Sequence, residues 1–448
     1  MYGARARAHL ARCLADAFLA GVWNERALAR RASSVLERRP RWLLAVVREV
    51  LAAYHRPPLD RPRELTAFVD AVLEALPWPT SETRPPKIRR WLIPEPEMGR
   101  RRWPVPQIAS SGALASFLGL EPGELDWLAD ARGLERTAED ERLRNYRYDW
   151  LPRREGSPRL IERPKRRLKA IQRRVLHEVL DLVPAHPAAH GFTRGHSART
   201  HAAEHTGRHV VLRMDFEDFF ASIAAGRVFG IFRTAGYPED VSYALTALTT
   251  NVVPLREWAA LARPHARDMR AAQAHHRLGR RLATPHLPQG APTSPALANL
   301  AAFRLDRRLA GLAASLGATY SRYADDLTLS GPLSLLRAAG EVWGWVAAIA
   351  AEEGFAINAR KTALMTRAGR QRVCGIVVNE RSNVMRGDYD ELKAILHNAA
   401  RNGPAAENRT GVADFRAHLL GRIAWVESLN PSRGAKLRRR FERIAWDG

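Results

Sequence analysis

Apolar and polar residues alternate along two short runs of the chain, Ala318–Tyr323 and Leu327–Ser330. A period of two is typical of a half-buried strand, so the two runs predict a β-hairpin. Two adjacent carboxylates, Asp325 and Asp326, lie at its turn. Neighbouring like charges disfavour each other's ionisation, which is tolerable in solvent and useful where a divalent cation binds. The pattern therefore predicts either an ordinary polar turn or part of a metal site.

Helical spacing of apolar residues dominates the two ends of the chain, residues 1–75 and the part after Arg386. The first such series is Leu10, Leu14, Phe18 and Val22. Another helix is expected around Ser111–Leu128. Prolines recur from Leu76 to Pro106, which predicts a linker or an extended wrap and not a packed element.

The middle of the chain, from Tyr146 onward, mixes short strand-like runs with helices, which favours an α+β domain over regular βαβ repeats. Residues His209–Met214 alternate like a strand, and Asp215 follows directly. If this strand lies beside the hairpin, Asp215 converges with Asp325 and Asp326. Three carboxylates that meet require cations, and oxygen ligands select Mg²⁺ or Mn²⁺. Two such ions can activate an attacking hydroxyl group and stabilise a leaving phosphate oxygen.

A second candidate ligand-binding segment is the loop Leu287–Pro295, whose small residues and prolines lead into a helix predicted from Ala296. Such a backbone can approach a planar ligand closely, and Gln289 is available to hydrogen-bond with it. Taken alone, the loop is equally typical of an ordinary helix start.

Composition adds a polyanionic partner to this picture. The 448 residues carry a formal net charge of +24 and a pI of about 11.1, and cations that neutralise phosphates gain by releasing counterions. A length of this size predicts roughly two to four structural units. The two cysteines, Cys13 and Cys374, exclude a disulfide framework and a cysteine-based zinc site. No apolar run approaches the roughly 20 residues that span a bilayer, so we expect a cytoplasmic protein without a membrane partner.

Two further clusters bear on nucleic-acid binding. Basic residues crowd from Arg142 to Arg174 around Tyr146, Tyr148 and Trp150, which is typical of a groove for a template and primer. Six histidines follow, at positions 186, 190, 196, 201, 205 and 209. Their spacing matches no compact set of metal ligands, so contact with RNA or simple packing is expected of them.

An ordered set of motifs between Tyr148 and Trp446 resembles the reverse transcriptases, and most closely the bacterial retron-type enzymes. The motifs, in chain order, are Pro152-Arg153, Gly156–Ile161, His190-Gly191-Phe192, Asp215–Phe220, Gln289-Gly290, Tyr323–Asp326, Gly354-Phe355 and Val373-Cys374-Gly375. Each motif is moderately specific, and their order along about two-thirds of the chain is highly specific.

This resemblance implies an active site. The metal-binding and catalytic carboxylates would be Asp215, Asp325 and Asp326, joined by the main-chain carbonyl of Phe216, and would hold two Mg²⁺ ions, with Mn²⁺ as an alternative. The residues that would bind the incoming deoxynucleotide are Arg153, Arg159, Phe220 and Gln289. Phe220 would be the steric gate that collides with a ribose 2′-hydroxyl. Lys361 would donate a proton to the departing pyrophosphate.

The resemblance also implies residues that contact nucleic acid: Lys169, His205, Val373, Cys374 and Gly375. Two retron-associated signatures are altered in this chain. His201 stands first in the segment His201-Ala202-Ala203-Glu204-His205, where the family has Asn, and Cys374 stands where the family has Thr. The implied partners are a structured non-coding RNA that serves as template and primer, its DNA product, and an effector protein in anti-phage defence.

The implied fold is α+β, a right-hand polymerase with an α-helical N-terminal extension. We expect the extension at residues 1–75, a Pro/Arg-rich linker at 76–110, fingers at 111–208, palm at 209–384 and a helical thumb at 385–448. The alternatives are another defence-associated reverse transcriptase, a group II intron-like maturase, and an RNA-binding scaffold with a vestigial polymerase fold. The intact Asp215, Asp325, Asp326, Gln289 and Lys361 favour an enzyme over the scaffold.

Overall fold

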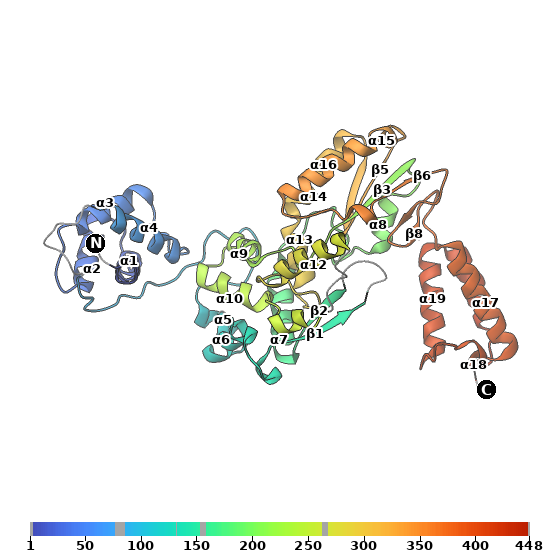
Figure 1. The fold of residues 1–448 in the computed structure, drawn as a ribbon, viewed down its shortest axis with the longest axis horizontal. Coiled ribbons are helices and arrows are strands. Elements are labelled where there is room, and N and C mark those ends of the chain that lie inside the picture. The colour runs from blue at the N-terminus through green and yellow to red at the C-terminus, as the bar shows by residue number, and fades with distance from the viewer. Residues whose placement is uncertain (1–2, 77–85, 131, 153–157, 262–267, 447–448) are drawn as a thin grey trace. The chain divides into compact units, whose positions relative to one another are not determined.

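The computed structural model describes residues 3–76, 86–130, 132–152, 158–261 and 268–446 (Figure 1). The chain divides into two compact units. The first comprises Met1–Val183 with Ala224–Ser294, and the second Pro184–Ile223 with Pro295–Gly448. Helices and antiparallel strands are mixed, which confirms the α+β prediction. The five segments expected from the resemblance, namely the extension, linker, fingers, palm and thumb, do not coincide with these two units. They stay a prediction.

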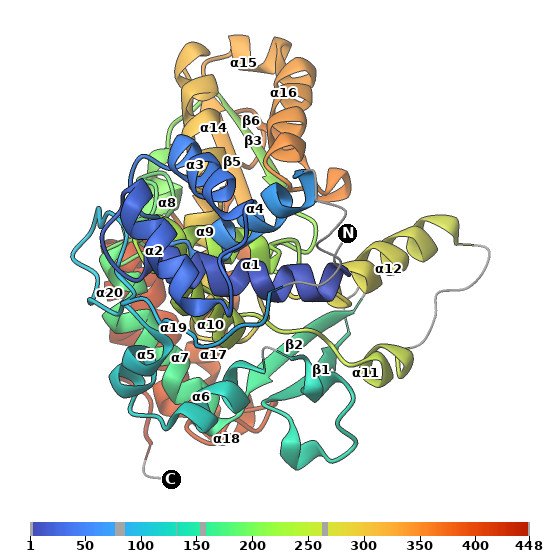
Figure 2. The ribbon, with the colours of Figure 1, turned by 90° about the vertical axis from the view of Figure 1, so that its left-hand side faces the viewer.

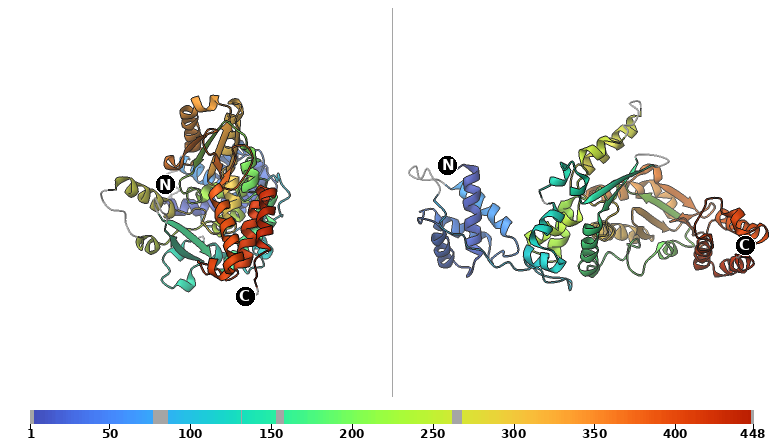
Figure 3. Two further views of the ribbon diagram at one scale, coloured as in Figure 1. Left: turned by 90° about the vertical axis from the view of Figure 1, so that its right-hand side faces the viewer. Right: turned by 90° about the horizontal axis from the view of Figure 1, so that it is seen from below.

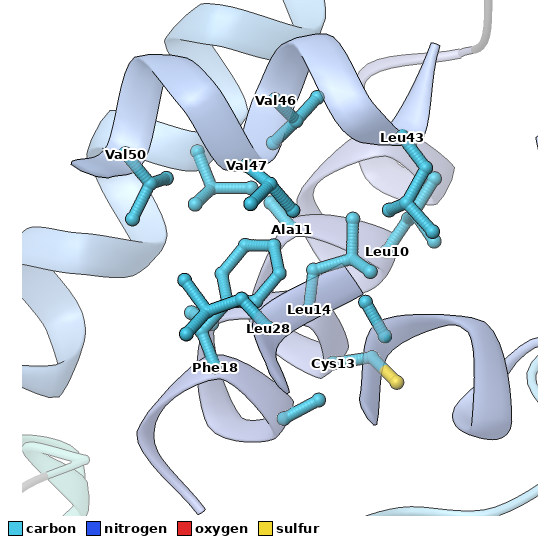
Figure 4. Close-up of a cluster of buried hydrophobic side chains, with 14 of the residues drawn as sticks. Leu10, Ala11, Cys13, Leu14, Phe18, Leu28, Leu43, Val46, Val47 and Val50 are labelled. Atoms are coloured by element: carbon cyan, nitrogen blue, oxygen red, sulfur yellow. The ribbon is translucent and has the colours of Figure 1, made fainter. Parts of the chain in front are cut away.

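Four helices open the first unit: α1 Ala4–Leu19, α2 Glu25–Val35, α3 Leu43–Ala53 and α4 Pro62–Ala75. Their apolar faces form one core, in which Leu10, Leu14 and Phe18 are at most 1% exposed (Figure 4). Val22 was predicted to continue this helical series, and that prediction was wrong: Val22 lies beyond the end of α1 and is 66% exposed. Helix α1 ends at Leu19, and Gly21 then adopts a φ of 138° that L-residues rarely reach.

Residues 86–106 of the proline-rich segment are extended, but part of this stretch is packed. Ile88 forms a β-bridge with Leu36, and Trp91 donates a 2.8 Å hydrogen bond from Nε1 to Asp16. Both Ile88 and Trp91 lie against the core of the four helices. This stretch is therefore an extended wrap, one of the two predicted forms, but the expectation that it is not packed is wrong, because apolar side chains between the prolines cover the helical core.

The rest of the first unit is helical around one hairpin. Its elements are α5 Ser111–Leu118, α6 Pro122–Ala129, the 3₁₀ turns Leu134–Arg136 and Glu141–Leu143, β1 Tyr146–Leu151, β2 Arg159–Pro164, α7 Arg166–Glu178, the 3₁₀ turn Leu180–Leu182, α9 Ala225–Thr234, α10 Glu239–Thr249, α11 Leu255–Ala259 and α12 Met269–Leu282. The single helix expected at 111–128 is two helices, because Gly119 closes α5 with a φ of 66° and Pro122 begins α6.

The second unit is built on a four-stranded antiparallel sheet. Its elements are α8 Ala198–Glu204, β3 Val210–Asp215, α13 Ser294–Ala301 (whose first residue belongs to the first unit), α14 Phe303–Ser315, β4 Thr319–Tyr323, β5 Asp326–Gly331, α15 Ser334–Arg337, α16 Ala339–Glu352, the 3₁₀ turn Ala359–Lys361, β6 Ala363–Thr366, β7 Arg372–Val373, β8 Ile376–Val377, α17 Arg386–Asn402, α18 Pro404–Glu407, α19 Phe415–Leu429 and α20 Pro431–Phe441. The strand order in the sheet is β4-β5-β3-β6.

Strands β4 and β5 form the predicted hairpin. Tyr323 pairs with Asp326, so only Ala324 and Asp325 remain in the turn. Strand β3 lies on the other side of β5, which confirms that the strand ending in Asp215 is a neighbour of the hairpin. The C-terminal helices α17, α19 and α20 have a separate core that includes Leu396, Ile423 and Leu437 (red in Figure 3).

A buried ion pair holds the hairpin to the helices beside it. Arg322 and Asp306 are both fully buried, and the guanidinium donates two hydrogen bonds, of 2.8 and 2.6 Å, to the two carboxylate oxygens of Asp306 on α14. Its remaining nitrogen, Nη1, donates to Oδ1 of Asn299 on α13 and to the carbonyl of Ala324, each at 3.0 Å. One side chain therefore joins two helices to the turn that carries the carboxylates.

The other side of the hairpin rests on neutral histidines from α8 and the residue after it. His205 contacts Ser330 and Ser321 at 2.7 and 2.8 Å, and His201 shares the Ser321 hydroxyl at 2.7 Å. Burial lowers the pKa of His201 to about 3 and that of His205 well below its usual value. The packing role predicted for the histidines is confirmed for these two.

None of the helices in the described part of the chain has the length and apolar character that a bilayer crossing requires.

The ion pair gives a stability prediction. Arg322→Leu leaves the Asp306 carboxylate buried without its cation, which should lower the free energy of unfolding by about 3–5 kcal/mol. The double variant Arg322→Leu/Asp306→Leu removes both charges and should recover more than half of that loss. Urea denaturation followed by circular dichroism measures both.

The matched control is Arg386→Leu, which breaks an exposed pair with Asp390 and should change the free energy by less than about 1 kcal/mol. A double variant no more stable than Arg322→Leu would show that the buried pair itself is not what the single substitution disrupts.

Candidate active site

The antiparallel register of β3 and β5 places Asp215 directly opposite Asp326. Side chains at such cross-strand positions have Cβ atoms about 4.5–5.5 Å apart. The third carboxylate is joined through the backbone, because the N–H of Phe216 donates to the carbonyl of Asp325 at 3.0 Å. The structure therefore brings together the strand ends from which the sequence predicted a metal site.

Burial and repulsion from neighbouring carboxylates make Asp215 and Asp326 costly to ionise. The pKa of Asp326 is raised to about 7, chiefly by burial, with Asp215 and Asp325 adding to the shift and Arg213 opposing it. The pKa of Asp215 is also raised by burial, while a hydrogen bond from Lys361 lowers it. A cation placed between these groups would relieve the repulsion.

Two cationic side chains already face the pair. Nζ of Lys361 donates to Oδ1 of Asp215 at 2.8 Å. Nε of Arg213 lies 3.9 Å from Oδ1 of Asp326, which is within ion-pair range but too far for a hydrogen bond. That buried oxygen of Asp326 makes no hydrogen bond to the described residues. An unsatisfied buried carboxylate oxygen is a strong acceptor for a further cation.

The donor set fits a hard divalent cation. Every candidate ligand is an oxygen atom, as Mg²⁺ and Mn²⁺ prefer, and Mg²⁺ commonly takes only one or two protein carboxylates and completes its shell with substrate phosphates and water. Within the described ranges, no three His, Cys, Asp or Glu side chains converge closely enough to form a full metal cage by themselves. The carboxylate pair suits a metal that the substrate helps to hold.

The turn between the carboxylates has little room to move. Ala324 adopts a φ of 56°, which is unusual for a residue with a side chain. Gly191 lies against it so closely that an added Cβ would be 2.4 Å from the amide nitrogen of Ala324. The carbonyl of Gly191 accepts a 2.8 Å hydrogen bond from Asn299, the residue that also receives Arg322. The predicted His190-Gly191-Phe192 motif is thus part of the hairpin's support.

Positive φ angles concentrate in the predicted motifs of the second unit. Four of the five non-glycine residues with positive φ in the described chain belong to this unit: Phe192, Asp218, Ala324 and Cys374. Such conformations cost on the order of 1–3 kcal/mol each and cluster at functional sites.

Aromatic rings form a shelf beside the carboxylates. Phe216, Phe219 and Phe355 have ring centroids 5.1–5.6 Å apart. Phe220 is half-buried, with its ring 5.5 Å from Phe219 and 6.4 Å from the exposed Phe192. Phe220 is therefore accessible from one side, as a residue that contacts a nucleotide must be.

The first unit gathers two of the predicted nucleotide-binding residues. The N–H of Glu162 on β2 donates to the carbonyl of Gln289 at 2.8 Å, so the Gln289-Gly290 loop is fixed to the strand that begins at Arg159. Nε of Arg159 is buried and makes no hydrogen bond to the described residues. Arg153 lies outside the described residues.

The residues predicted to contact nucleic acid differ in exposure. Lys169 and Gly375 are exposed, Cys374 is half-buried, and Val373 and His205 are fully buried. Cys374 and Gly375 form the turn of the β7–β8 hairpin, and the thiol is close enough to Asp326 and Asp325 for their charges to add to the burial that raises its pKa to about 12. His205 supports β4 and β5 from within, so any effect of His205 on RNA must pass through the hairpin.

Several positioning residues were missed from the sequence. Arg322, Asp306 and Asn299 hold the turn, and a charged residue inside an apolar strand pattern was the available signal for Arg322. Glu162 and His286 form a second buried pair, with Nε2 of His286 3.1 Å from the carboxylate and Asn251 donating to Glu162 at 2.8 Å. Nothing in the sequence pattern marks these two as partners, because 124 positions separate them.

Comparisons with known proteins show the family to which the chain belongs. Residues 151–393 match the family model described as reverse transcriptase (RNA-dependent DNA polymerase). The retron Mx65 reverse transcriptase of Myxococcus xanthus is 39% identical over 361 residues, which cover 81% of this chain and 77% of that protein. The retron Mx162 enzyme of the same organism is 34% identical, with 76% and 68% covered.

The retron Ec86 reverse transcriptase of Escherichia coli is 34% identical over 240 residues, covering 53% of this chain and 64% of that protein. Among solved structures, a foamy viral protease-reverse transcriptase in complex with double-stranded DNA aligns with a TM-score of 0.36 at 12% identity, covering 89% of this chain and 55% of that one. That structural likeness is too low to support an argument. The family match spans more than half of the chain, and it includes the carboxylate hairpin and its neighbouring strand. The chain therefore belongs to the reverse transcriptases, which are RNA-directed DNA polymerases, and among them to the retron-type enzymes.

Proposed function

We propose that the chain joins deoxynucleotides by two-metal nucleotidyl transfer at Asp215, Asp325 and Asp326. The observation that carries the proposal is the register that sets Asp215 opposite Asp326, whose buried Oδ1 accepts no hydrogen bond from the part of the chain that the structure describes. Two bound Mg²⁺ ions, or Mn²⁺ in their place, would activate the attacking hydroxyl and stabilise the leaving phosphate oxygen. The carbonyl of Phe216 is proposed as a further ligand.

The protein's own side chains would position the triphosphate. Arg159, whose Nε makes no hydrogen bond to the described residues, would bind a phosphate oxygen through its guanidinium group, and Arg153 is proposed to do the same. Gln289 would contact the nucleotide, and Phe220 would exclude a 2′-hydroxyl by steric collision. In the step itself the primer hydroxyl gives up its proton to water, its oxygen bonds to the α-phosphorus, and the bond from that phosphorus to the pyrophosphate oxygen breaks. Lys361 would then protonate the leaving pyrophosphate, moving from its contact with Asp215.

We also propose that the template is a structured non-coding RNA that provides its own priming 2′-hydroxyl, so that the product is a branched RNA–DNA hybrid. Membership of the retron-type enzymes supports this proposal. Lys169, His205, Val373, Cys374 and Gly375 would take part in recognising that RNA, with His205 acting through the hairpin. Anti-phage defence together with an effector protein is the role proposed by the same analogy.

The metal site is tested by Asp326→Asn. The amide keeps the shape of the carboxylate but removes a buried charge opposite Asp215, so we expect folding stability to be unchanged or higher. Nucleotide incorporation should fall by at least about 100-fold, because charge stabilisation at the reacting phosphate is lost. The measurements are single-nucleotide extension of a primed RNA template and thermal unfolding of the same variant.

Asp218→Asn is the matched control, since Asp218 lies in the turn just after the strand that ends at Asp215 and its φ of 47° suits Asn. It should keep extension within about threefold of the parent protein, as expected for a change away from the reacting groups. Normal extension by Asp326→Asn, or equal losses in both variants, would contradict the assignment.

The steric gate is tested by Phe220→Ala. Removing the ring should admit ribonucleotides, so the preference for a deoxynucleotide over the matching ribonucleotide should fall by at least about tenfold, the size expected when a contact worth 1.4 kcal/mol is lost. Competing both nucleotides in one extension reaction measures that ratio. Unchanged sugar discrimination would remove Phe220 from the gate role.

The template proposal is tested by the nucleic acid that co-purifies with the protein. Sequencing it with and without debranching treatment should reveal one short DNA joined 2′–5′ to one RNA. A linear DNA would instead favour another type of defence reverse transcriptase, and an intron RNA would favour a maturase-like role.

A further inference from the structure

Helix α12 is a strongly cationic element that the site described above does not use. Its 14 residues include four arginines and two histidines and no acidic residue. Only Leu278 and Leu282 are buried in it. In Figures 2 and 3 the helix extends away from the β1–β2 hairpin of the same unit. A helix with so small a buried face contributes little to a core.

The base of α12 is firmly anchored. The ring of Trp258 on α11 lies 4.3 Å from that of His275, and a Cβ added to Gly279 would be 2.7 Å from the same indole. Trp258 is in turn 6.1 Å from Trp150 on β1, whose indole N–H donates to the carbonyl of Glu257 at 3.2 Å. This aromatic clamp of Trp150, Trp258 and His275 holds α12 against the β1–β2 hairpin. Strand β2 of that hairpin begins at Arg159, which is predicted to bind the nucleotide.

Two of the cations of α12, Arg270 and Arg280, are not used to build the described part of the protein. Arg270 and Arg280 are exposed, and neither makes an ion pair or hydrogen bond with the described residues. Arg270 sits in the first turn, where the helix dipole is already positive, so this placement disfavours the isolated helix. A cation placed against the dipole, on a clamped helix without acidic residues, is complementary to an external polyanion.

We propose that α12 is a binding surface for the phosphate backbone of single-stranded RNA, namely template RNA outside the primer duplex. The chemistry of the surface fits this partner, because arginine forks bind phosphate oxygens and arginine and histidine planes can stack on unpaired bases. The inference rests on the RNA-templated activity of the family and is independent of the proposed metal site.

The test uses the full chain and two template-primers with the same duplex, one with a long and one with a short single-stranded RNA extension. The parent protein should bind the long form more tightly than the short form. The Arg270→Gln/Arg280→Gln variant should lose this gain in affinity. The slope of log affinity against log salt should decrease by about 1.4, from about 0.7 for each of two phosphate contacts. Single-turnover extension of the short form should be unchanged, which shows that the variant is folded.

The matched control is Arg26→Gln/Arg30→Gln, which removes two exposed charges from α2 and should keep the gain. The proposal would be overturned if the α12 variant kept the full gain in affinity for the long form, or if the control variant lost as much of that gain as the α12 variant does. A third template-primer carries the same extension as DNA. Equal dependence on Arg270 and Arg280 for that substrate would overturn the assignment to RNA.

Discussion

The second unit depends on one buried guanidinium. Arg322 occupies a fully enclosed position and uses its planar set of donors on three elements at once: Asp306 on α14, Asn299 on α13 and the carbonyl of Ala324 in the turn. A lysine has no comparable geometry, because its ammonium group cannot hold a carboxylate through two parallel hydrogen bonds. Burying such a pair is costly unless all its donors are satisfied. Here the satisfied donors fix the backbone that presents Asp325 and Asp326.

Rigidity of this kind allows the site to tolerate unfavourable charge. Two carboxylates face each other across β3 and β5, and burial raises the pKa of each. If the turn were flexible, the two carboxylates would move apart and their repulsion would be relieved. The Arg322 contacts, the close approach of Gly191 and the histidine–serine contacts beneath the hairpin prevent that movement. The repulsion therefore persists in the folded protein, and a bound cation would offset it, as expected of a preorganised metal site.

The sequence could predict what depends on local pattern. Alternation gave the β4–β5 hairpin and β3, and an ordered set of motifs gave the family and the carboxylates. The sequence could not show three contacts: the ion pair of Arg322 with Asp306, the burial of His205 against Ser330 of β5, and the pairing of Glu162 with His286. Each of these contacts joins residues that are 16 to 125 positions apart. Val22 was misplaced because helical spacing continues past Gly21, where the backbone itself turns.

The hairpin held by Arg322 presents Asp326 opposite Asp215, and we propose that these two carboxylates form a divalent-cation site. The decisive measurement is anomalous diffraction from crystals of the chain grown with Mn²⁺, a primed RNA template and a non-reactive nucleotide. We expect an anomalous peak between the carboxylates of Asp215 and Asp326, with the Arg322–Asp306 pair intact behind the turn. Metal bound elsewhere, with those two carboxylates free of it, would show that they do not form the cation site.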